Sequence, residues 1–568
     1  MIKHILRVDM NSLKCTLAEV PSEYERLGGR GLTSTIVAKE VNPLAEPLGP
    51  HNKLIIAPGI LGGTSAPCAQ RLSAGGKSPL TGGIKEANSG GTAAQKLGRL
   101  GLAAIVIEGI QQKGNLSVIY VGKGEAKLEE ANDLKGTGNY ATTERLRAKY
   151  GSHVGIISIG QAGEMLMSAA SLAITDKDGI PCRHAARGGL GAVMGSKGIK
   201  AIVIDDNKVP KIVSPADPEL FKRTAKAFSQ TIKDQPRVKN VLPVFGTAIV
   251  IGIANEAGTL PTRNFSKGQF EGANHIDGKA LAKLIDSRGG KRGHACYQGC
   301  LIRCSNVLPD SNGNHLTSSL DYETLAMFGS NCGIDDLDTI ATLDRMCDDY
   351  GLDTIETGNA MGVAMEAGLL SFGDRRRAIE ILEEVAKGTH LGRVLGQGSL
   401  ITGKVFGVRR IPVIKGQGLP AWDPRRTVAT GVTMITSPQG ADHTAGRLPG
   451  VSELDRMKPG EIVPLSRELQ IEVCVIDSIG LCFFADTAPE TFEYLAQLVS
   501  ALYGSESKVE DLMEMGRKIL KTERKFNTAA GFSAIDDRLP EFMLSEPLLP
   551  TNSTFTVSDD EIDEMFNF

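Results

Sequence analysis

The 568-residue sequence contains few aromatic residues: Phe, Trp and Tyr together make up 5%, and Trp422 is the single tryptophan. A groove for single-stranded nucleic acid relies on aromatic side chains on which bases stack, so the composition argues against this class of protein. The formal net charge is only −3, which indicates no basic surface for nucleic acid or for an anionic membrane. We therefore expect no nucleic-acid partner.

Long hydrophobic runs are also missing. No apolar stretch approaches the ~18 residues of a membrane helix. The N-terminal residues MIKHILRVDMNSLKC lack the apolar core of a secretory signal and continue into a strand-like pattern. We therefore expect no membrane span and a cytoplasmic location. In a cytosolic protein of this size, the ten cysteines indicate free thiols or metal ligands rather than a disulfide framework.

Glycine, by contrast, is abundant, with 66 residues. Within residues 1–208 it is concentrated in loops such as RLSAGGKSPLTGG and AARGGLGAVMGSKG, which allow backbone N–H groups to approach a ligand such as a phosphate. Short β-branched runs such as KLIIAPG, AAIVIEG and KAIVIDD lie between these loops and predict strands. We predict a β-rich domain over residues 1–208, without a repeat of solenoid or propeller period.

Helical spacing dominates the rest of the chain. Clear examples are PELFKRTAKAFSQTIKD, DDLDTIATLDRMCDDYG and KVEDLMEMGRKILKTERKFN. We predict two mainly helical domains, residues 209–416 and 417–568, and hence an α+β fold. The acidic tail SDDEIDEMFNF is expected to be a solvated terminus.

Three cysteines fall within nine residues in CYQGCLIRC, at Cys296, Cys300 and Cys304. On a plain helix this spacing would place them on one face, where small thiols can serve packing alone. Their density and the basic, polar flanking sequence favour metal binding instead. Zinc sites combine a short-spaced pair with a second pair or with histidines, and no second pair is present.

Three local cysteines and one distant cysteine suit a [4Fe–4S] cluster better than zinc. Cys482, in DSIGLC, is the candidate for the fourth ligand, and Cys332, Cys347 and Cys474 are alternatives. We interpret Cys15, Cys68 and Cys182 as core or surface thiols.

One hexapeptide pattern occurs twice, as DDYGLD at 348–353 and as DSIGLC at 477–482. Each copy alone is an ordinary helix C-cap, in which glycine permits a tight turn. Two copies, one of them ending on a candidate cluster cysteine, suggest a ligand with two equivalent halves. The carboxylates of Asp348 and Asp477 suit the adjacent N–H donors of a guanine-like or pterin ring.

Together these motifs resemble the tungsten-containing aldehyde ferredoxin oxidoreductase family. The resemblance covers nearly the whole chain and rests on many segments in the family's order, among them LGGRGLTSTIVAKE, EANSGGTAAQKLGRLG, LPTRNF, SLDYETLAMFGSNCGIDDL and TSPQGADHTAGR. It implies a β base beneath two helical domains, and a tungsten or molybdenum atom held by two molybdopterins whose phosphates share Mg²⁺.

The resemblance also assigns residues to this cofactor. Asp348 and Asp477 would each bind one pterin ring, and the same two segments would contribute Leu352, Asp353 and Leu481. The loops that meet the phosphates and magnesium contain Arg71, Asn88, Gly90, Arg183 and Arg187. Cys296, Cys300, Cys304 and Cys482 would hold the cluster.

Glu323 in DYETL and His443 in GADHTAG match the family's acid–base pair beside the metal. Aldehyde oxidation adds oxygen from water and releases two electrons and protons, and a carboxylate or imidazole can activate the water and carry protons away. Without the resemblance, Glu323 is also a plausible first-turn residue of a helix, and His443 a loop residue.

The chain departs from the family pattern in two places. The family's cluster motif is C-x2-C-x3-C, whereas the spacing here is C-x3-C-x3-C. No histidine follows a glutamate by three residues, so the iron that bridges subunits in one branch of the family is not expected. A homodimer or a larger complex remains open.

We expect an aldehyde or related carbonyl substrate, and ferredoxin or an iron–sulfur subunit as electron acceptor. One alternative is a low-potential reductase of the class II benzoyl-CoA reductase type, in which a cysteine ligates tungsten; Cys332 is the candidate. The other is a non-catalytic iron–sulfur electron-transfer subunit.

Overall fold

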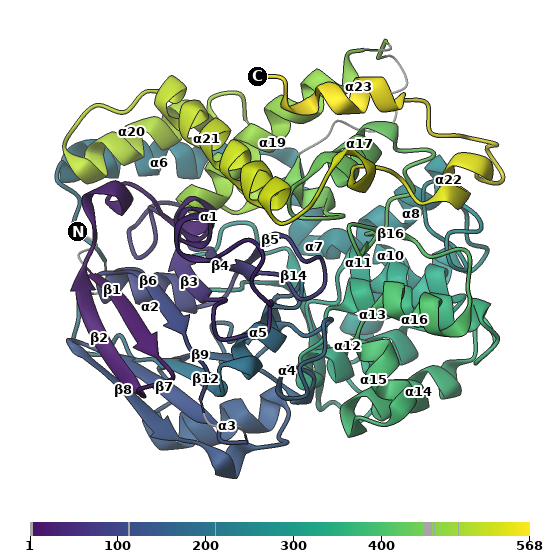
Figure 1. Cartoon of the computed structure of the whole chain (residues 1–568), viewed down its shortest axis with the longest axis horizontal. Helices are drawn as coiled ribbons and strands as arrows, with labels where there is room; N and C mark the ends of the chain where they lie inside the picture. The colour runs from purple at the N-terminus through teal and green to yellow at the C-terminus, as the bar shows by residue number, and fades with distance from the viewer. Residues whose placement is uncertain (1–3, 112–113, 211, 447–456, 459, 487) are drawn as a thin grey trace.

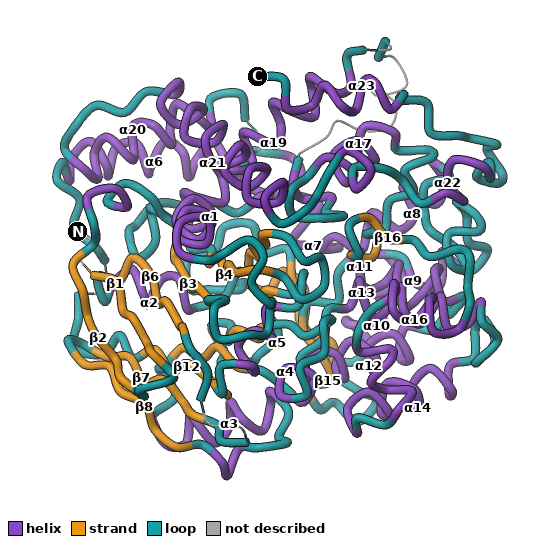
Figure 2. The backbone as a smooth tube through the Cα atoms, in the orientation of Figure 1, coloured by secondary structure: helices purple, strands orange, loops and turns teal. Residues whose placement is uncertain are grey.

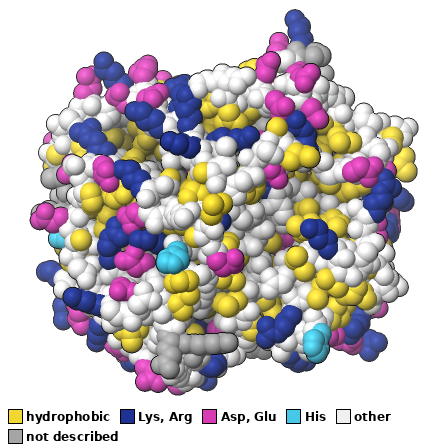
Figure 3. Space-filling model, viewed as in Figure 1, with side chains coloured by type: hydrophobic (Ala, Val, Ile, Leu, Met, Phe, Trp, Pro, Cys, Tyr) yellow, Lys and Arg dark blue, Asp and Glu magenta, His cyan; other side chains and the backbone are white. Residues whose placement is uncertain are grey.

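The computed structural model describes residues 4–568 except 112–113, 211, 447–456, 459 and 487. Its strands gather in the N-terminal part of the chain, while helices form most of the remainder (Figures 1 and 2). The predicted α+β fold is confirmed. On the face seen in Figure 3, basic and acidic side chains are interspersed.

The N-terminal domain consists of two six-stranded sheets with the same topology. The first has the order β2-β1-β6-β3-β4-β5, and the second, read from its β8 edge, has the order β8-β7-β12-β9-β10-β11. In each sheet an antiparallel hairpin pairs in parallel with the last strand, as in β1 with β6 and β7 with β12. The domain is therefore an internal duplication with a period of about one hundred residues, as expected for a domain-sized unit.

The bounds of the strands and accompanying helices follow the duplication. The first copy contains β1 (His4–Asp9), β2 (Lys14–Glu19), α1 (Gly29–Glu40), β3 (Leu54–Pro58), β4 (Leu72–Lys77), β5 (Ile84–Ser89), α2 (Ala93–Arg99) and β6 (Leu102–Glu108). The second contains β7 (Ser117–Gly122), β8 (Glu125–Glu130), α3 (Asn139–Tyr150), β9 (Gly155–Ser158), α4 (Gln161–Glu164), β10 (Leu172–Ile174), β11 (Arg183–Ala185), α5 (Leu190–Ser196) and β12 (Ile199–Ile204).

The two sheets share one hydrophobic core. β6 and β12 occupy equivalent inner positions, and their apolar runs are buried almost throughout. Ile105 and Ile107 of β6 belong to the same buried cluster as Ile202 and Ile204 of β12. Burial on both faces explains why these strands read as continuous apolar segments rather than as alternating ones.

The helical region begins with α6 (Pro218–Asp234), whose N-cap is Asp217. Its principal helices are α8 (Val250–Ala257), α10 (Gly278–Ser287), α12 (Leu337–Tyr350), α13 (Thr354–Glu366), α14 (Arg375–Lys387), α15 (His390–Gly396), α16 (Ser399–Phe406), α17 (Val428–Thr436), α19 (Ile462–Ile479), α20 (Thr491–Tyr503) and α21 (Val509–Ala529). Among them, α6, α12 and α21 match the segments that the sequence analysis names as clear helices.

A small sheet interrupts this helical region and carries the cysteine segment. It is formed by β13 (Lys291–His294), β14 (Ser305–Pro309) and β15 (His315–Ser318). Cys296, Cys300 and Cys304 lie in the loop between β13 and β14, so they do not share a helix face. The sequence does not announce this sheet because its strands are short and mostly polar.

Both copies of the repeated hexapeptide end a helix in the same way. α12 is followed by Gly351 with φ 73°, and α19 by Gly480 with φ 84°. The next amide then turns back: Leu352 N donates to Cys347 O at 2.9 Å, and Leu481 N donates to Ile476 O at 3.0 Å. This is the glycine-terminated helix end that the sequence predicts.

Each of these helix ends docks on one copy of the duplicated domain. Arg71 N, just before β4, donates to Gly480 O at 3.0 Å. At the equivalent place before β10, Ser171 N donates to Gly351 O at 2.9 Å. The duplication of the base therefore explains why the hexapeptide occurs twice.

Glycines make these contacts close. A Cβ on Gly59, after β3, would lie 2.3 Å from Gly480 Cα, and a Cβ on Gly160, after β9, would lie 2.3 Å from the carbonyl carbon of Tyr350. Any larger residue would push the helix end away from the sheet.

The acidic C-terminal tail is not a solvated extension, contrary to the expectation. It forms α23 (Asp559–Asp563) and a final turn, in which Ile562 and Met565 are buried. Arg467 of α19 donates to Met565 O at 2.7 Å. Burial of two apolar side chains outweighs the solvation of the acidic residues, which remain on the outer face.

One segment of the described residues passes the length and composition test for a membrane helix, which by itself is weak evidence for a span. Among the described residues, the segment Arg237–Ala257 is long and apolar enough by length and composition. Within it, Gly246 adopts a φ of 62° between α7 (Leu242–Phe245) and α8, and helical types alternate along its length. Alanine and glycine residues lie between the larger apolar residues of this segment, so it does not stand out in the sequence.

Docking of α19 can be tested at Gly29, the first residue of α1. Gly29 has a φ of 45°, and a Cβ there would lie 2.1 Å from Asp477 O. Gly136 has a φ of 73°, and a Cβ there would have nothing within 4 Å, so this glycine is a matched control. We expect Gly136→Ala to cost about 1–2 kcal/mol for the left-handed backbone. Gly29→Ala should lower the unfolding temperature further because of the added clash; equal losses would contradict the docking.

Candidate functional site

Two adjoining cavities lie where the β domain meets the helical region. The larger, of about 340 Å³, is lined by Asp348, Glu323 and five cysteines, which are the four proposed cluster ligands and Cys182. The smaller, of about 210 Å³, is lined by Asp477 and His443. Both are bordered by Arg71, His184, Ala186, Arg187 and Ile355, so they form one composite site with one acid of the repeated hexapeptide in each half.

In the first half-site, side chains of the second domain copy hold Asp348. His184 Nε2 lies 3.1 Å from Asp348 Oδ1, and Ser171 Oγ lies 2.7 Å from His184 Nδ1. Tyr140, at the start of α3, donates its hydroxyl to Asp348 Oδ2 at 3.4 Å. The acid is only 7% exposed, and these contacts orient its carboxylate in the wall of the cavity.

In the second half-site, Arg30 occupies the place that corresponds to Tyr140, at the start of α1. Arg30 Nη1 lies 3.5 Å from Asp477 Oδ2, while Arg30 Nε and Nη2 form a bidentate pair with Glu523 at 2.9 and 2.7 Å. Burial raises the pKa of Asp477 to about 6, against the opposing charges of Arg30 and Arg71. Burial, together with the charge of Asp477, raises the pKa of the neighbouring Glu86 to about 8.

Arg71 and Arg183 offer positive charge to the cavities. Arg71 Nε is hydrogen-bonded to Asn88 Oδ1 on β5, and both residues border the smaller cavity. Arg183 donates through Nη2 to Ser305 Oγ at 2.7 Å, while its Nε is buried without a partner among the described residues. Gly90 lies beside the cysteines, because a Cβ there would be 3.3 Å from Cys296 Sγ.

Arg187 forms hydrogen bonds with other residues of the chain. It donates to Asp353 Oδ2 at 3.1 Å, to Ala441 O at 2.9 Å and to Gly418 O at 2.6 Å. Asp353 in turn caps α13 by accepting from Ile355 N at 2.9 Å. The geometry of these two residues therefore serves to hold together the walls of the composite site.

The four cysteines assigned to a cluster line the same cavity. Cys296, Cys300 and Cys304 come from the β13–β14 loop, and Cys482 directly follows Leu481 at the end of α19. Cys482 N donates to Cys68 O at 2.7 Å, which fixes the segment. The structure brings these four together although nearly 180 residues of other structure separate them in sequence.

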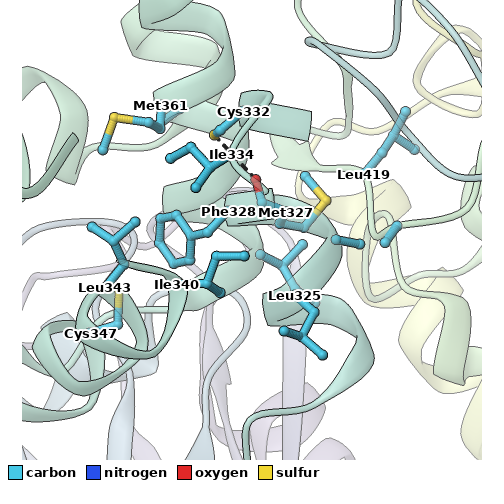
Figure 4. Packing of buried hydrophobic residues seen from close by; sticks show 14 of the residues in the cluster. Leu325, Met327, Phe328, Cys332, Ile334, Ile340, Leu343, Cys347, Met361 and Leu419 are labelled. Carbon is cyan, nitrogen blue, oxygen red and sulfur yellow. Dashed lines mark hydrogen bonds between the residues drawn. The ribbon is translucent and has the colours of Figure 1, made fainter. Parts of the chain in front are cut away.

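The alternative cysteines lie elsewhere. Cys332 and Cys347 are buried within a hydrophobic cluster, and Cys332 donates to Met327 O at 3.2 Å (Figure 4). Cys474 packs in a separate cluster with Ile471 and Leu520. None of the three lines either cavity.

The spacing of the four cavity thiols does not match a single zinc ion. Zinc holds its sulfur ligands at about 2.3 Å, which requires the sulfurs to lie close together. Among the described residues, no three of these four thiols have sulfur atoms within 4.8 Å of one another. The hydrogen bond from Cys300 lowers the pKa of the Cys296 thiol to about 5, and Arg183 and Arg71 lower it further, whereas burial opposes the shift. A partly exposed set of thiols, spaced more widely than a single zinc ion requires, fits a larger iron–sulfur cluster.

Glu323 and His443 face each other where the two cavities adjoin. His443 Nε2 lies 3.4 Å from Glu323 Oε1. Glu323 Oε2 accepts a hydrogen bond from Ala421 N at 2.8 Å, which orients the carboxylate from the first turn of α11 (Tyr322–Thr324). Glu323 Oε1 and His443 Nδ1 are buried without a hydrogen-bond partner among the described residues.

Several unpartnered buried atoms lie around the composite site. Native proteins pair more than about nine in ten buried polar atoms. Around these cavities, however, the described residues include the following without partners: Arg183 Nε, His294 Nδ1, Glu323 Oε1, Gln439 Nε2 and His443 Nδ1. Hydrogen-bond donors and hydrogen-bond acceptors therefore both face the cavities. This fits a large polar group with phosphates and ring N–H donors.

Comparisons with known proteins agree with this architecture. Residues 5–206 match the family described as aldehyde ferredoxin oxidoreductase, N-terminal domain, and residues 223–567 match its domains 2 and 3. Similar curated proteins include the tungsten-containing aldehyde ferredoxin oxidoreductases of Thermococcus kodakarensis and Pyrococcus furiosus, at 36% and 34% identity. Each alignment covers 96% of this chain and 91% of the relative.

A solved structure also shares the fold. The active-site complex BamBC of benzoyl coenzyme A reductase, with 1,5-dienoyl-CoA, contains a chain that is 20% identical and superposes with a TM-score of 0.84, over 99% of this chain and 93% of that one. Fold, site and relatives thus define an oxidoreductase. More particularly, the chain belongs to the aldehyde ferredoxin oxidoreductase family.

Sequence reasoning missed several residues that shape the site. Arg30, Tyr140 and His184 each contact one of the two hexapeptide acids, yet the sequence analysis gave none of them a role, although Arg30 lies in the segment LGGRGLTSTIVAKE. The available signal was the weak similarity between the two halves of residues 1–208, which places Arg30 and Tyr140 after comparable glycines.

The cluster assignment can be tested by replacing Cys300. We expect Cys300→Ala to lower the iron content of anaerobically purified protein and to destabilise the chain, because the β13–β14 loop loses its anchor. Cys332→Ala is the matched control, since it removes a buried thiol that lines neither cavity. It should retain both iron and tungsten. Iron unchanged in Cys300→Ala would refute the ligand assignment.

Proposed function

We propose that this protein oxidises aldehydes to carboxylic acids at a tungsten bis-pterin centre. Electrons would pass through a [4Fe–4S] cluster to ferredoxin or to an iron–sulfur partner subunit, and the enzyme would act in the cytoplasm. The observation that carries the proposal is the placement of Glu323 and His443, 3.4 Å apart, between two acid-lined half-sites and beside the four cysteines.

The residues of the two half-sites are suited to a paired pterin. Asp348 and Asp477 would each accept hydrogen bonds from one pterin ring, with Leu352 and Leu481 contributing backbone groups. Arg71, Asn88, Gly90 and Arg183 would meet the phosphates and Mg²⁺, and Arg187 and Asp353 would brace the site. When bound, such a cofactor supplies a metal that accepts two electrons from the substrate. The relatives are named as tungsten enzymes, and molybdenum has the same ligand chemistry.

Glu323 and His443 would handle the protons. The reaction converts an aldehyde and water into a carboxylic acid with release of two electrons and two protons. Glu323, oriented by Ala421 N, is placed to accept a proton from water through its free Oε1. His443 lies close enough to receive that proton or to polarise the carbonyl through its own free nitrogen.

The position of Cys482 provides a short route for electrons. Because Cys482 lines the larger cavity and belongs to the same hexapeptide as Asp477, a cluster bound by Cys482 would adjoin the composite site. Cys300 and Cys482 are only half-buried, and residues 298 and 299 are exposed, so the cluster would also lie near the surface. A partner protein can then exchange electrons without entering the cavity.

The alternatives fit the site less well. A reductase of the benzoyl-CoA type would place a cysteine on tungsten, but Cys332 lines neither cavity and packs in a hydrophobic core (Figure 4). A non-catalytic electron-transfer subunit would have no need for Glu323, His443 and both hexapeptide acids in one connected site.

We predict that Glu323→Gln retains tungsten and loses turnover. The amide keeps the size of the side chain but cannot accept the proton, and loss of a general base typically costs about 10²–10⁴ in rate. Tungsten content and aldehyde-dependent dye reduction should be measured on the same sample. Retained activity would show that Glu323 serves only the structure.

We predict that His443→Asn lowers turnover and alters its pH profile. Asparagine can still donate a hydrogen bond, but it does not titrate between pH 5 and 8 as histidine does. The profile of kcat should therefore lose one ionisation while tungsten stays bound. A slower enzyme with the wild-type pH profile would argue against proton transfer by His443.

A further inference from the structure

His294, which no motif marks, sits in the wall of the larger cavity with one ring nitrogen fixed and the other free. Only 2% of the residue is exposed. Its Nε2 lies 2.9 Å from Asp176 Oδ2, whereas its Nδ1 is buried and has no hydrogen-bond partner among the described residues. A buried imidazole nitrogen without a partner is costly, so it indicates a group that binds there.

Asp176 is itself rigidly held, which makes the ring position definite. Its Oδ1 accepts from Asp178 N at 2.8 Å and from Ile180 N at 3.0 Å, so the carboxylate is fixed by the turn after β10. Its Oδ2 then faces His294. The arrangement resembles the way in which a carboxylate orients a ligating or catalytic histidine.

The neighbours of His294 identify the chemistry of the missing partner. His294 is the cross-strand partner of Ser305, and Ser305 accepts from Arg183 Nη2 at 2.7 Å. Arg183 Nε is also buried without a partner among the described residues, and both residues line the cavity that contains the four cysteines. Two unpartnered nitrogens from adjoining elements, one of them cationic, call for an anionic acceptor.

We propose that His294, oriented by Asp176, is a positioning residue that donates a hydrogen bond through Nδ1 to an anionic atom of the cofactor assembly. The acceptor is either a phosphate oxygen of the pterin or a sulfur of the cluster. Carboxylate oxygens of Asp176 and Asp178 lie 2.9 and 3.6 Å from Nε2, which leaves Nδ1 as the ring nitrogen available to the cofactor assembly. This inference rests on the proposed function.

Asp176, Asp178 and His294 also meet the spacing of a metal site. Two contacts favour the hydrogen-bonding role instead. Lys177 Nζ lies 2.7 Å from both oxygens of Asp178, which neutralises that carboxylate, and Asp176 Oδ1 is used by backbone amides. The experiment therefore also tests whether these three residues bind a metal ion.

The test compares two substitutions at position 294 in anaerobically purified holoenzyme. His294→Gln can keep a donor near Nε2 for Asp176 but leaves no group at Nδ1. His294→Asn places an amide near Nδ1 and gives up the contact with Asp176. His153→Gln is the control: His153 also pairs with an aspartate, Asp205, at 3.0 Å, but lines neither cavity.

The readouts are iron and tungsten content, the electron paramagnetic resonance spectrum of the reduced cluster, its midpoint potential, and the unfolding temperature. If the acceptor is a cluster sulfur, His294→Gln should shift the spectrum and lower the potential with both metals retained, because hydrogen bonds to sulfur stabilise the reduced cluster. If the acceptor is a phosphate, His294→Gln should lose tungsten several-fold and keep an unchanged cluster spectrum. In either case His294→Asn should be closer to wild type.

Three results would overturn the proposal. The first is a His294→Gln variant that matches His153→Gln in every readout. The second is an equal loss of metals and thermal stability in both position-294 variants, which would leave His294 a folding role only. The third is a divalent cation that is present in wild type and lost in both His294→Gln and Asp178→Asn, which would assign the three residues to a metal. Wild-type protein that holds tungsten and iron but oxidises no aldehyde would refute the proposed function and leave this inference standing.

Discussion

The structure depends on the docking of two helix ends against two copies of one β fold. Gly351 and Gly480 terminate α12 and α19, and each presents its carbonyl to a backbone amide of one domain copy. The aspartate three residues before each glycine is thereby placed at the same level above its sheet. Because the contacts are backbone to backbone and too close for a Cβ, the helices have little freedom to shift. Each half-site therefore contains one hexapeptide aspartate at the end of a helix that docks in the same way.

The two copies of the β fold have the same topology, but the two halves of the composite site differ in their side chains. The Asp348 side is bordered by His184, Tyr140 and the cluster cysteines, whereas the Asp477 side is bordered by Arg30 and Glu86. The central residues therefore meet a different electrostatic environment on each side, although the folds beneath are alike. Burying so many ionisable groups is costly unless they are paired, and some atoms without a partner among the described residues, such as Arg183 Nε and Glu323 Oε1, face the cavities. A charged cofactor bound in these cavities would offset the free-energy cost of the unpaired groups that face them.

Sequence reasoning succeeded where a local pattern carries the information. The buried strands β6 and β12 read as continuous apolar runs, the helices as apolar positions with 3.6-residue spacing, and the two hexapeptides as helix ends. It located Asp348, Asp477 and the cysteine segment for the same reason. It did not reveal the duplication, because the two copies share topology and glycine positions more than side chains. Arg30, Tyr140 and His294 act through tertiary contacts, and the spacing of residues in the sequence does not predict such contacts. The polar strands β13 to β15, and the tail that buries Ile562 and Met565, depend on packing against distant elements.

The central claim is that this fold holds a tungsten centre and one cubane cluster in a single connected site. Elemental analysis of anaerobically purified protein, reading tungsten, molybdenum and iron together, tests it most directly. The account predicts about one tungsten and about four iron atoms per chain, the count for one [4Fe–4S] cluster. Iron without tungsten or molybdenum would contradict it and would leave an electron-transfer protein whose catalytic residues have no metal to serve.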